Sequence, residues 1–273
     1  MEMTRLRRIF RPRAIARRVR RVYRLRRVTR DWLKLVRFSP GGDGASQPPI
    51  RLRSGFVMNH GKWDNPVLML EEVFLDRWYE HDGGSPPSDA TMVDIGANMG
   101  AVSLYWAGAA DSLQIHAYEP NPAANNTLQT NVSANDLHRR VEVFAEAVGR
   151  GDGELDLWVD VPTDLSTGYL DHSPVDGGRR VSVPMVGMEQ IWQRLDRRGI
   201  WLLKVDTEGA EADILEGAPL EMLQATQNAI IEYHDNICPG ASERCRKVLD
   251  AAGFRYRTRV HPWDEGIFYA SRD

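Results

Sequence analysis

Short apolar runs recur along the chain and are separated by segments whose apolar residues have helical spacing. The runs cover residues 91–95, 113–118, 141–145 and 200–205, and each is long enough for a buried strand. A regular alternation of strand and helix predicts a mostly parallel sheet with helices on both faces. We therefore expect residues 89–273 to form one α/β domain.

The other periodic segments fit the same domain. Helical spacing marks residues 122–135, 189–195 and 242–252. Two strands near the end of the chain, residues 254–260 and 266–270, are expected to pair antiparallel and to finish the sheet.

Residues 154–159 alternate between polar and apolar side chains, which indicates a half-buried strand. We expect it to pair with residues 147–148 across the Gly-rich turn between them. Residues 162–180 then show no periodicity, and a long irregular segment in a compact domain is usually functional or mobile. The polar residues of this segment, which fit either a binding loop or disorder, are Asp164, Ser166, Thr167, Tyr169 and His172.

Residues 50–88 precede the α/β domain and have a pattern of their own. A short hairpin is expected first. A helical stripe of apolar residues follows over 65–79 and begins at an Asn-Pro pair, which is typical of a helix start. We expect this region to form a cover that roofs a pocket of the main domain, with Trp63 and Trp78 in its core.

Basic residues are concentrated at the start of the chain. Residues 1–40 contain fifteen Arg and Lys but only two acids, a net charge of +13, whereas the whole chain carries −3. Residues 1–38 are expected to form a helical arm, which a Gly/Pro linker over 39–49 joins to the rest. The apolar stripe of the arm contains Ile15, Val19, Val22, Leu25, Trp32, Leu33 and Val36.

Three partners fit such an arm. It can contact an anionic membrane through residues 1–37, bind nucleic acid, or pack on the acidic domain of its own or another chain. The arm lacks the uninterrupted apolar stretch of a secretory signal, and no later run reaches the length of a membrane span. Cys238 and Cys245, the only cysteines, indicate neither a disulfide framework nor a zinc site. A cytoplasmic setting is therefore expected.

A Gly-rich turn follows the first strand of the domain, with the pattern Asp94-x-Gly96-x-Asn98-x-Gly100. The glycines let the backbone approach a ligand, and the first N–H groups of the following helix are free to donate, which suits an anionic or polyhydroxylated ligand. The spacing excludes the dinucleotide fingerprint and the P-loop. It resembles the first motif of class I S-adenosylmethionine (SAM) methyltransferases. In those enzymes the turn passes under the methionine part of SAM, and a carboxylate such as Asp94 helps to hold the loop.

Acidic residues end the next two strands. Glu119 lies about 20 residues after the turn, where nucleotide-binding folds bind ribose hydroxyls. Its two carboxylate oxygens can accept from two vicinal hydroxyls. Glu146 ends the strand over 141–145, where it can receive an adenine amino group or lie on the surface.

Further charged residues end two strands downstream. Asp206 and Glu208 follow one apolar strand, and Glu232 and His234 end the next. In doubly wound sheets the carboxyl ends of the strands face the ligand crevice. These four side chains are therefore expected to gather beside the Gly-rich turn.

The motifs form one longer pattern along the chain. It comprises Val93-Asp94-Ile95-Gly96-Ala97-Asn98-Met99-Gly100, Tyr118-Glu119-Pro120, Leu203-Lys204-Val205-Asp206-Thr207-Glu208-Gly209-Ala210-Glu211, Leu215-Glu216-Gly217-Ala218 and Ile231-Glu232-Tyr233-His234. In order and spacing, over residues 68–235, this pattern resembles the FkbM family of SAM-dependent methyltransferases. The resemblance implies a class I, Rossmann-like methyltransferase fold. It also implies O-methylation of a hydroxyl on a sugar, a glycolipid or a polyketide-type natural product.

Methylation of a hydroxyl needs a base within hydrogen-bond reach, because an alcohol does not ionise unaided at neutral pH. His234 has the most suitable ordinary pKa for this role, whereas Asp206 and Glu208 need raised pKa values or a metal. Asp206 together with Glu232 or Asp235 fits a hard cation such as Mg²⁺, which would lower the pKa of the hydroxyl.

A structural interpretation competes with this chemistry. Lys204, Asp206 and Glu208 can form an ion-pair network that fixes the turn between strand and helix, and Glu211 can serve the same purpose.

Two functions of other classes also fit parts of the chain. A nucleic-acid methyltransferase would use the Arg-rich arm, but Val205-Asp206-Thr207-Glu208 lacks the Asn/Asp-Pro-Pro-aromatic run typical of base amino methylation. A non-catalytic scaffold with a SAM-type fold at a membrane would keep the fold and lose the site. The retained glycines, Glu119 and the strand-end acids disfavour it.

Overall fold

The computed structural model describes residues 19–35, 48–62, 64–81, 83–161, 168, 173 and 175–272. Most of the linker therefore lies outside the described residues. The same holds for several residues singled out from the sequence: Ile15, Val36, Trp63, Asp164, Ser166, Thr167, Tyr169 and His172.

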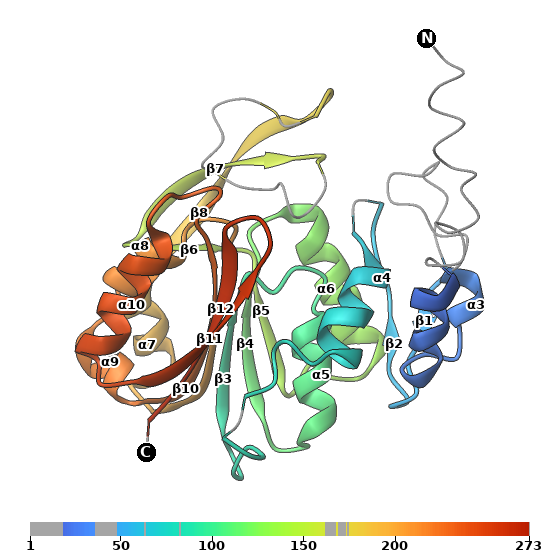
Figure 1. Ribbon diagram of the computed structural model, residues 1–273, viewed down its shortest axis with the longest axis horizontal. Helices are drawn as coiled ribbons and strands as arrows, with labels where there is room; N and C mark the ends of the chain where they lie inside the picture. Colours follow the sequence, from blue (N-terminus) through green and yellow to red (C-terminus); the bar gives the residue numbers. More distant parts are fainter. Residues whose placement is uncertain are drawn as a thin grey trace.

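A seven-stranded sheet with the order β11-β12-β10-β9-β3-β4-β5 forms the centre of the molecule (Figure 1). Its strands are parallel except for β12, which is antiparallel to both of its neighbours. The predicted Rossmann-like fold and the antiparallel pair near the end of the chain are thus confirmed. The strands are β3 (Thr91–Ile95), β4 (Gln114–Tyr118), β5 (Val141–Phe144), β9 (Ile200–Val205), β10 (Thr226–His234), β11 (Arg255–His261) and β12 (Glu265–Ser271).

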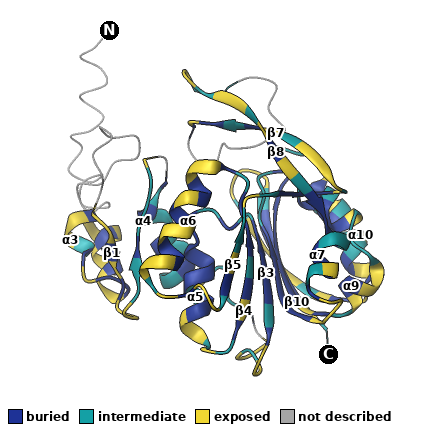
Figure 2. Ribbon diagram, turned by 180° about the vertical axis from the view of Figure 1, so that it is seen from behind, coloured by how far each residue is buried: buried dark blue, intermediate teal, exposed yellow. Residues whose placement is uncertain are grey.

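Helices cover both faces of this sheet, and successive strand residues alternate between two buried clusters (Figures 1 and 2). Met92 and Leu202 belong to one cluster, whereas Val93 and Leu203 belong to the other. Burial on both faces explains why the central strands β3 and β9 are mostly apolar. The first cluster packs under α5 (Ala101–Ala109) and α6 (Pro122–Ala134), and the second under α7 (Met188–Arg194), α8 (Glu211–Glu216), α9 (Leu220–Gln224) and α10 (Ala241–Ala251).

A smaller sheet stands beside the first and has the order β6-β8-β7. It consists of β6 (Ala147–Gly149), β7 (Gly153–Val159) and β8 (Arg179–Gly187). The expected strand at 154–159 is present, but its predicted pairing with residues 147–148 is wrong because β8 lies between them. The long β8 offers β7 a seven-residue antiparallel ladder, whereas β6 is only three residues long.

The cover, residues 50–88, begins with the expected hairpin of β1 (Ile50–Arg51) and β2 (Val57–Met58). The helix then starts where the Asn-Pro pair predicts: the Asn65 side chain accepts from the backbone N–H of Leu68, and Pro66 occupies the first turn. The helix is shorter than its apolar stripe. It runs as α4 (Pro66–Met69), continues as the π-helix η2 (Leu70–Leu75) and ends before Arg77, whose φ is 51°.

The described part of the arm, residues 19–35, packs on the cover. It contains a short helix, the 3₁₀ turn η1 (Leu25–Arg27) and α3 (Trp32–Leu35). Its buried side chains, which join the first cluster, are Val22, Leu25, Val28 and Leu35. Ion pairs join Arg21 to Glu71 and Arg24 to Asp76. Within the described ranges, no helix has both the length and the apolar character needed to cross a bilayer.

Candidate functional site

The Gly-rich turn between β3 and α5 lies against the end of β9. Gly96 has a φ of +73°, and a Cβ at this position would lie 1.7 Å from the carbonyl oxygen of Asp206. Gly100 has a φ of +88°, and its Cβ would lie 2.4 Å from Cδ1 of Leu128. Only glycine fits such positions, because both the backbone conformation and the available space exclude a side chain.

Asp94 and Lys204 hold this turn from beneath. Asp94 is fully buried and accepts from the Ser103 hydroxyl at 2.7 Å. The Lys204 ammonium lies 3.3 Å from Asp94 and donates to the carbonyl oxygens of Ile95 and Gly96 at 3.1 and 2.6 Å. Burial disfavours the charge of Lys204, but the nearby charges of Asp94 and Asp206 outweigh it and raise its pKa. Both residues therefore support the turn from within the protein.

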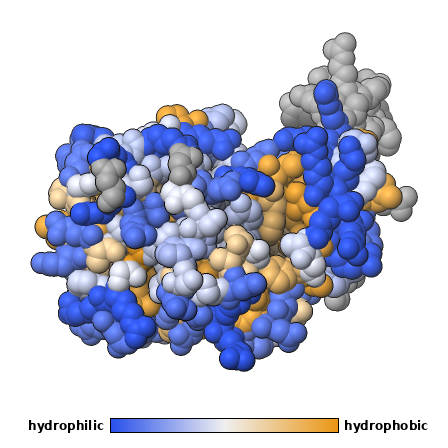
Figure 3. Space-filling view, turned by 90° about the horizontal axis from the view of Figure 1, so that it is seen from below, coloured by the Kyte–Doolittle hydropathy of each residue, from blue (hydrophilic) through white to orange (hydrophobic). Residues whose placement is uncertain are grey.

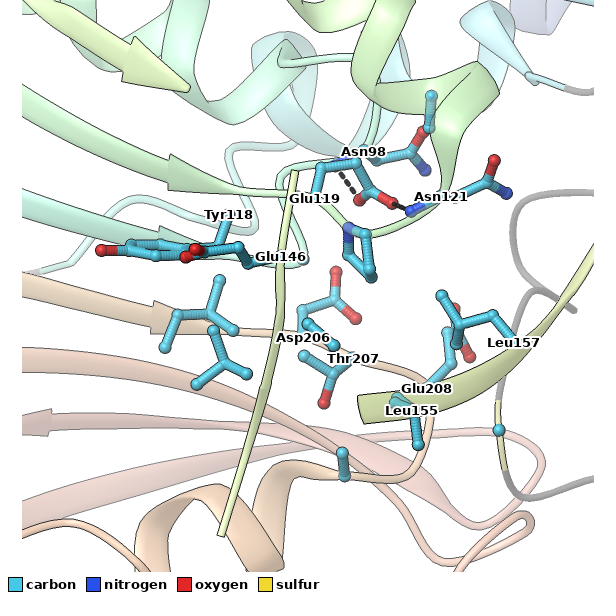
Figure 4. A pocket seen from close by; sticks show the side chains of 18 residues that line it. Asn98, Tyr118, Glu119, Asn121, Glu146, Leu155, Leu157, Asp206, Thr207 and Glu208 are labelled. Carbon is cyan, nitrogen blue, oxygen red and sulfur yellow. Dashed lines mark hydrogen bonds between the residues drawn. The ribbon is translucent and has the colours of Figure 1, made fainter. Parts of the chain in front are cut away.

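Glu119 lies at the tip of β4 with both carboxylate oxygens engaged. The backbone N–H of Asn98 donates to one oxygen and that of Asn121 to the other, each at 2.8 Å (Figure 4). Burial raises the pKa of Glu119 to about 7, against the lowering effect of these two hydrogen bonds. Each oxygen keeps acceptor capacity for one further donor.

A first hollow opens beside this carboxylate. It is floored by the turn at Gly96 and Asn98 and closed on another side by Leu155 and Leu157 of β7 (Figure 4). The small sheet thus supplies an apolar wall to a site whose polar groups come from the large sheet. Glu119, Asn121, Glu146, Asp206, Thr207 and Glu208 line the same hollow.

Glu146 also lines the first hollow, as its position after β5 suggests, but its carboxylate is engaged. Arg194 donates to its two oxygens at 2.5 and 3.0 Å. The Arg194 guanidinium lies over the ring of Phe144, 5.0 Å from its centroid. The sequence did not single out Arg194, because no motif links α7 to the strand end that it contacts.

A second hollow lies between the cover, the tips of β9 and β10, and the turn joining β11 to β12. The cover therefore lines a pocket, and Trp78 contributes to that lining. Gly96, Asn98, Asp206 and Glu208 line both hollows. The two hollows meet at these four residues.

Tyr79 of the cover joins two strand tips in the second hollow. Its hydroxyl lies 3.1 Å from Oδ2 of Asp206 and 2.5 Å from Oε2 of Glu232. Burial and the charge of Asp206 raise the pKa of Glu232 to about 8. Burial, together with the charges of Glu232 and Asp206, likewise raises the pKa of Glu72 to about 8. No local pattern marks Tyr79, because its role depends on residues more than 120 positions away.

His234 lies between two carboxylates. Its Nδ1 is 3.0 Å from Glu211, and its Nε2 is 3.3 Å from Glu208. Burial alone would lower the pKa of His234, but the hydrogen bond with Glu211 and the charges of Glu208 and Glu211 raise it to about 11. His234 therefore does not keep the ordinary pKa on which its predicted role as the base depends, because the two carboxylates favour the protonated ring.

Glu208 adopts a left-handed backbone conformation, with a φ of 54°. Its side chain keeps 27% of its surface exposed toward the hollows. The surrounding protein nevertheless raises the pKa of its carboxyl well above the usual range, against the opposing effect of His234. The Glu208 carboxyl and the His234 imidazole thus lie close enough for a proton to pass between them.

Glu211 closes the turn between β9 and α8. Its Oε1 accepts from the backbone N–H groups of Thr207 and Gly209 at 2.9 and 3.0 Å. The same oxygen orients His234. The structural interpretation of Glu211 is confirmed by these hydrogen bonds, and the residue also positions a neighbouring side chain of the site.

The donor set for a cation differs from the predicted one. Asp206, Glu208 and His234 have ligand atoms within 4.8 Å of one another, whereas Glu232 is bound to Tyr79. Asp235 instead accepts from the backbone N–H and hydroxyl of Ser242, near the start of α10. A protonated His234 has no lone pair for a metal, and the Lys204 ammonium lies 3.5 Å from Asp206. A cation bound by Asp206, Glu208 and His234 would have to displace the proton of His234.

Comparisons with known proteins agree with the motifs. A family model described as the methyltransferase FkbM domain matches residues 94–256. Methyltransferase 1 of Beauveria bassiana (strain ARSEF 2860) is 28% identical over 223 residues, which cover 73% of this chain and 87% of that protein. The 31-O-demethyl-FK506 methyltransferase FkbM of Streptomyces tacrolimicus is 23% identical over 231 residues, covering 75% of this chain and 88% of that protein.

Among solved structures, methyltransferase FkbM from Methylobacillus flagellatus KT aligns with a TM-score of 0.48 and 17% identity. The alignment covers 74% of this chain, but this chain spans only 53% of that one.

Proposed function

The chain belongs to the FkbM methyltransferase family, and we propose that it transfers the methyl group of SAM to a hydroxyl of a sugar, a glycolipid or a polyketide-type molecule. One observation carries the proposal: the first hollow, beside Glu119, meets the second hollow at Asp206 and Glu208. A methyl donor in one hollow and an acceptor in the other can react only at that junction.

The residues of the first hollow fit SAM. Gly96 and Asn98 line this hollow, so a ligand in it would lie against the turn. Glu119 is held by two backbone N–H groups, and its remaining acceptor capacity suits two ribose hydroxyls. Leu155 and Leu157 offer an apolar wall, and Glu146 remains the candidate for an adenine amino group. Bound SAM supplies a methyl group already activated by its sulfonium.

The residues of the second hollow fit a hydroxyl acceptor. Asp206 and Glu208 present carboxylate oxygens at the junction, where they can accept from a hydroxyl and orient its oxygen toward the first hollow. In its ionised form, the Glu208 carboxylate, 3.3 Å from Nε2 of His234, can receive a proton from a hydroxyl bound at the junction. We assign the leaving hydroxyl proton to Glu208, with His234 balancing its charge and Glu211 positioning His234.

The name of one relative also supports transfer of the methyl group to an oxygen atom. The name of the Streptomyces tacrolimicus protein describes a substrate that lacks a methyl group on oxygen. Carboxylates together with Trp78, which lies beside His261 at 4.3 Å between ring centroids, suit a ring that carries several hydroxyls.

Calorimetric titration with SAM tests the cofactor part of the proposal. We expect binding in the micromolar range, and about a 10²- to 10⁴-fold loss in Glu119→Ala, because two charge-assisted hydrogen bonds to a ligand contribute about 1.5–3 kcal/mol each. Glu221→Ala, which removes an exposed acid of α9, is the matched control and should bind normally. Thermal unfolding of both variants separates lost binding from lost folding.

The absence of heat with the unaltered protein would contradict the proposal and favour a non-catalytic scaffold. If SAM binds, methyl transfer from labelled SAM to a panel of sugar and polyketide hydroxyls tests the acceptor class. Label recovered in RNA or DNA but in no hydroxyl compound would favour a nucleic-acid methyltransferase instead.

A further inference from the structure

Residues 19–35, which we call the basic face, present two different sides. The side that packs on the cover is apolar, with Val22, Leu25, Val28 and Leu35 buried in the first cluster. The opposite side is exposed. Its side chains are Val19, Arg20, Arg21, Tyr23, Arg24, Arg26, Arg27, Arg30, Leu33 and Lys34.

Part of the positive charge is used within the chain. Arg21 and Arg24 pair with acids of the cover, and Lys34 lies 2.8 Å from Asp31. The arginines of the basic face that remain exposed beyond these pairs are Arg20, Arg26, Arg27 and Arg30. Asp31, the only acid in this segment, is buried, and its hydrogen bond with Arg51 holds its pKa far below the usual range. The exposed side therefore carries positive charge without an exposed acid.

Apolar side chains lie among these arginines. Leu33 is 66% exposed, Tyr23 47% and Val19 42%. Exposed aliphatic surface beside arginine is the composition of helices that lie in a membrane interface, where the apolar groups enter the acyl boundary and the cations meet anionic head groups. Figure 3 shows this side of the molecule, at the right of the view, as strongly hydrophilic with hydrophobic residues at its margin.

We propose that the basic face docks on an anionic lipid bilayer. Nucleic acid would also attract the arginines, but it offers nothing to Leu33 and Val19. Stacking with bases needs a free aromatic face. Arg26 lies over the ring of Tyr23, 4.5 Å from its centroid, and Trp32 packs against the edge of that ring at 5.4 Å. The aromatic group is therefore engaged within the protein.

The docking surface is connected to the second hollow. On η2, Glu71 holds Arg21, whereas its neighbour Glu72 lines the hollow. Docking would hold that hollow near the bilayer, where a lipid-borne acceptor could enter. This consequence rests on the proposed function, but the docking itself does not.

Sedimentation of the full chain with vesicles tests the proposal. We expect binding to vesicles of phosphatidylcholine mixed with phosphatidylglycerol, little binding to phosphatidylcholine alone, and weakening by salt. Replacing Arg20, Arg26, Arg27 and Arg30 together by Gln should lower the partition coefficient several hundredfold, since each basic residue near such a surface contributes about fivefold. Leu33→Ser should lower it by about tenfold.

The matched control replaces four exposed arginines of the main domain by Gln: Arg139, Arg150, Arg198 and Arg255. It changes the net charge equally and should leave vesicle binding nearly unchanged. Equal losses in the two quadruple variants would overturn the proposal, as would failure of the unaltered protein to bind the anionic vesicles. It would also fail if the variants of the basic face lost RNA binding but kept vesicle binding. SAM titration and thermal unfolding of each variant show whether the main domain stays intact.

Discussion

The first hollow is lined mainly by turns that directly follow the strands of the large sheet, whereas the second takes much of its wall from the cover and from the turn between β11 and β12. In the first hollow, the polar atoms of Glu119 are held by backbone N–H groups of Asn98 and Asn121, and those of Glu146 by the Arg194 side chain. Those of the second are held by one another, as Tyr79 links Asp206 to Glu232. The carboxylate of Glu119 in the first hollow is thus fixed by the backbone, whereas the acids of the second hollow depend on hydrogen bonds among side chains.

The largest expected effect comes from the turn at Gly96, which lines both hollows. Gly96→Ala places a Cβ against the Asp206 carbonyl in a left-handed conformation. We expect it to abolish SAM binding and to lower the free energy of unfolding by about 3–5 kcal/mol. Gly84→Ala has a similar φ of +79° but nothing within 4 Å of its Cβ, so it should cost only about 1–2 kcal/mol. Chemical denaturation and calorimetry measure both, and equal losses would mean that the close approach at Gly96 is unimportant.

A second substitution should act on the second hollow and spare the first. His234→Gln removes the cation that pairs with Glu208, so we expect kcat to fall by about 10²- to 10⁴-fold. SAM affinity should stay within about twofold of the parent. His138→Gln, at an exposed position, is the control. Unchanged turnover with an unchanged pH profile would remove His234 from the mechanism.

The pH dependence of stability should report the proton that Glu232 holds in the second hollow. The pKa of Glu232 rises to about 8 in the folded protein from an ordinary value of 4.5, chiefly through burial. The folded state keeps a proton that the unfolded chain loses, so the stability from this group is complete below the ordinary pKa and is lost as the pH rises to about 8. Glu232→Gln removes this loss.

We therefore expect Glu232→Gln to be more stable than the parent by about 1–2 kcal/mol near pH 9, with little difference near pH 5. Thermal unfolding at the two pH values measures this. Glu221→Gln, at an exposed position, should show no such change. A variant that is equally stabilised at both pH values would contradict the assigned pKa.

The smallest effect concerns the hydroxyl that joins the cover to the strand tips. Tyr79→Phe removes the hydroxyl that lies between the buried Glu232 and the partly exposed Asp206 and should lower the free energy of unfolding by about 1–2 kcal/mol. Tyr256→Phe removes an exposed hydroxyl bonded to Asp250 and should cost less than about 0.5 kcal/mol. If denaturation gave the two variants equal losses, Tyr79 would not brace the second hollow.

Much of the large sheet could be predicted because its central strands, β3 and β9, are buried on both faces and therefore appear as apolar runs. The pairing of β7 could not be predicted, because an alternating pattern of polar and apolar residues shows that a strand is half-buried but not which strand it pairs with. In the structure β7 pairs with β8, although β6 lies closer to β7 in the sequence. The cover likewise has one feature that the sequence predicts and one that it does not. Asn65 and Pro66 marked the start of its helix, but the π-helical turn over Leu70–Leu75 has no local signature.

The sequence by itself determined the Gly-rich turn, Glu119 and the positions of Asp206, Glu208, Glu232 and His234 at strand ends, because parallel strands bring their carboxyl ends to one edge of a sheet. Only the tertiary structure decided what those side chains do together. Glu211 and Glu208 hold His234 as a cation, and Tyr79 bridges two acids from the cover. These states depend on burial and on distances of a few ångströms between segments far apart in the chain, which residue patterns along the sequence do not contain.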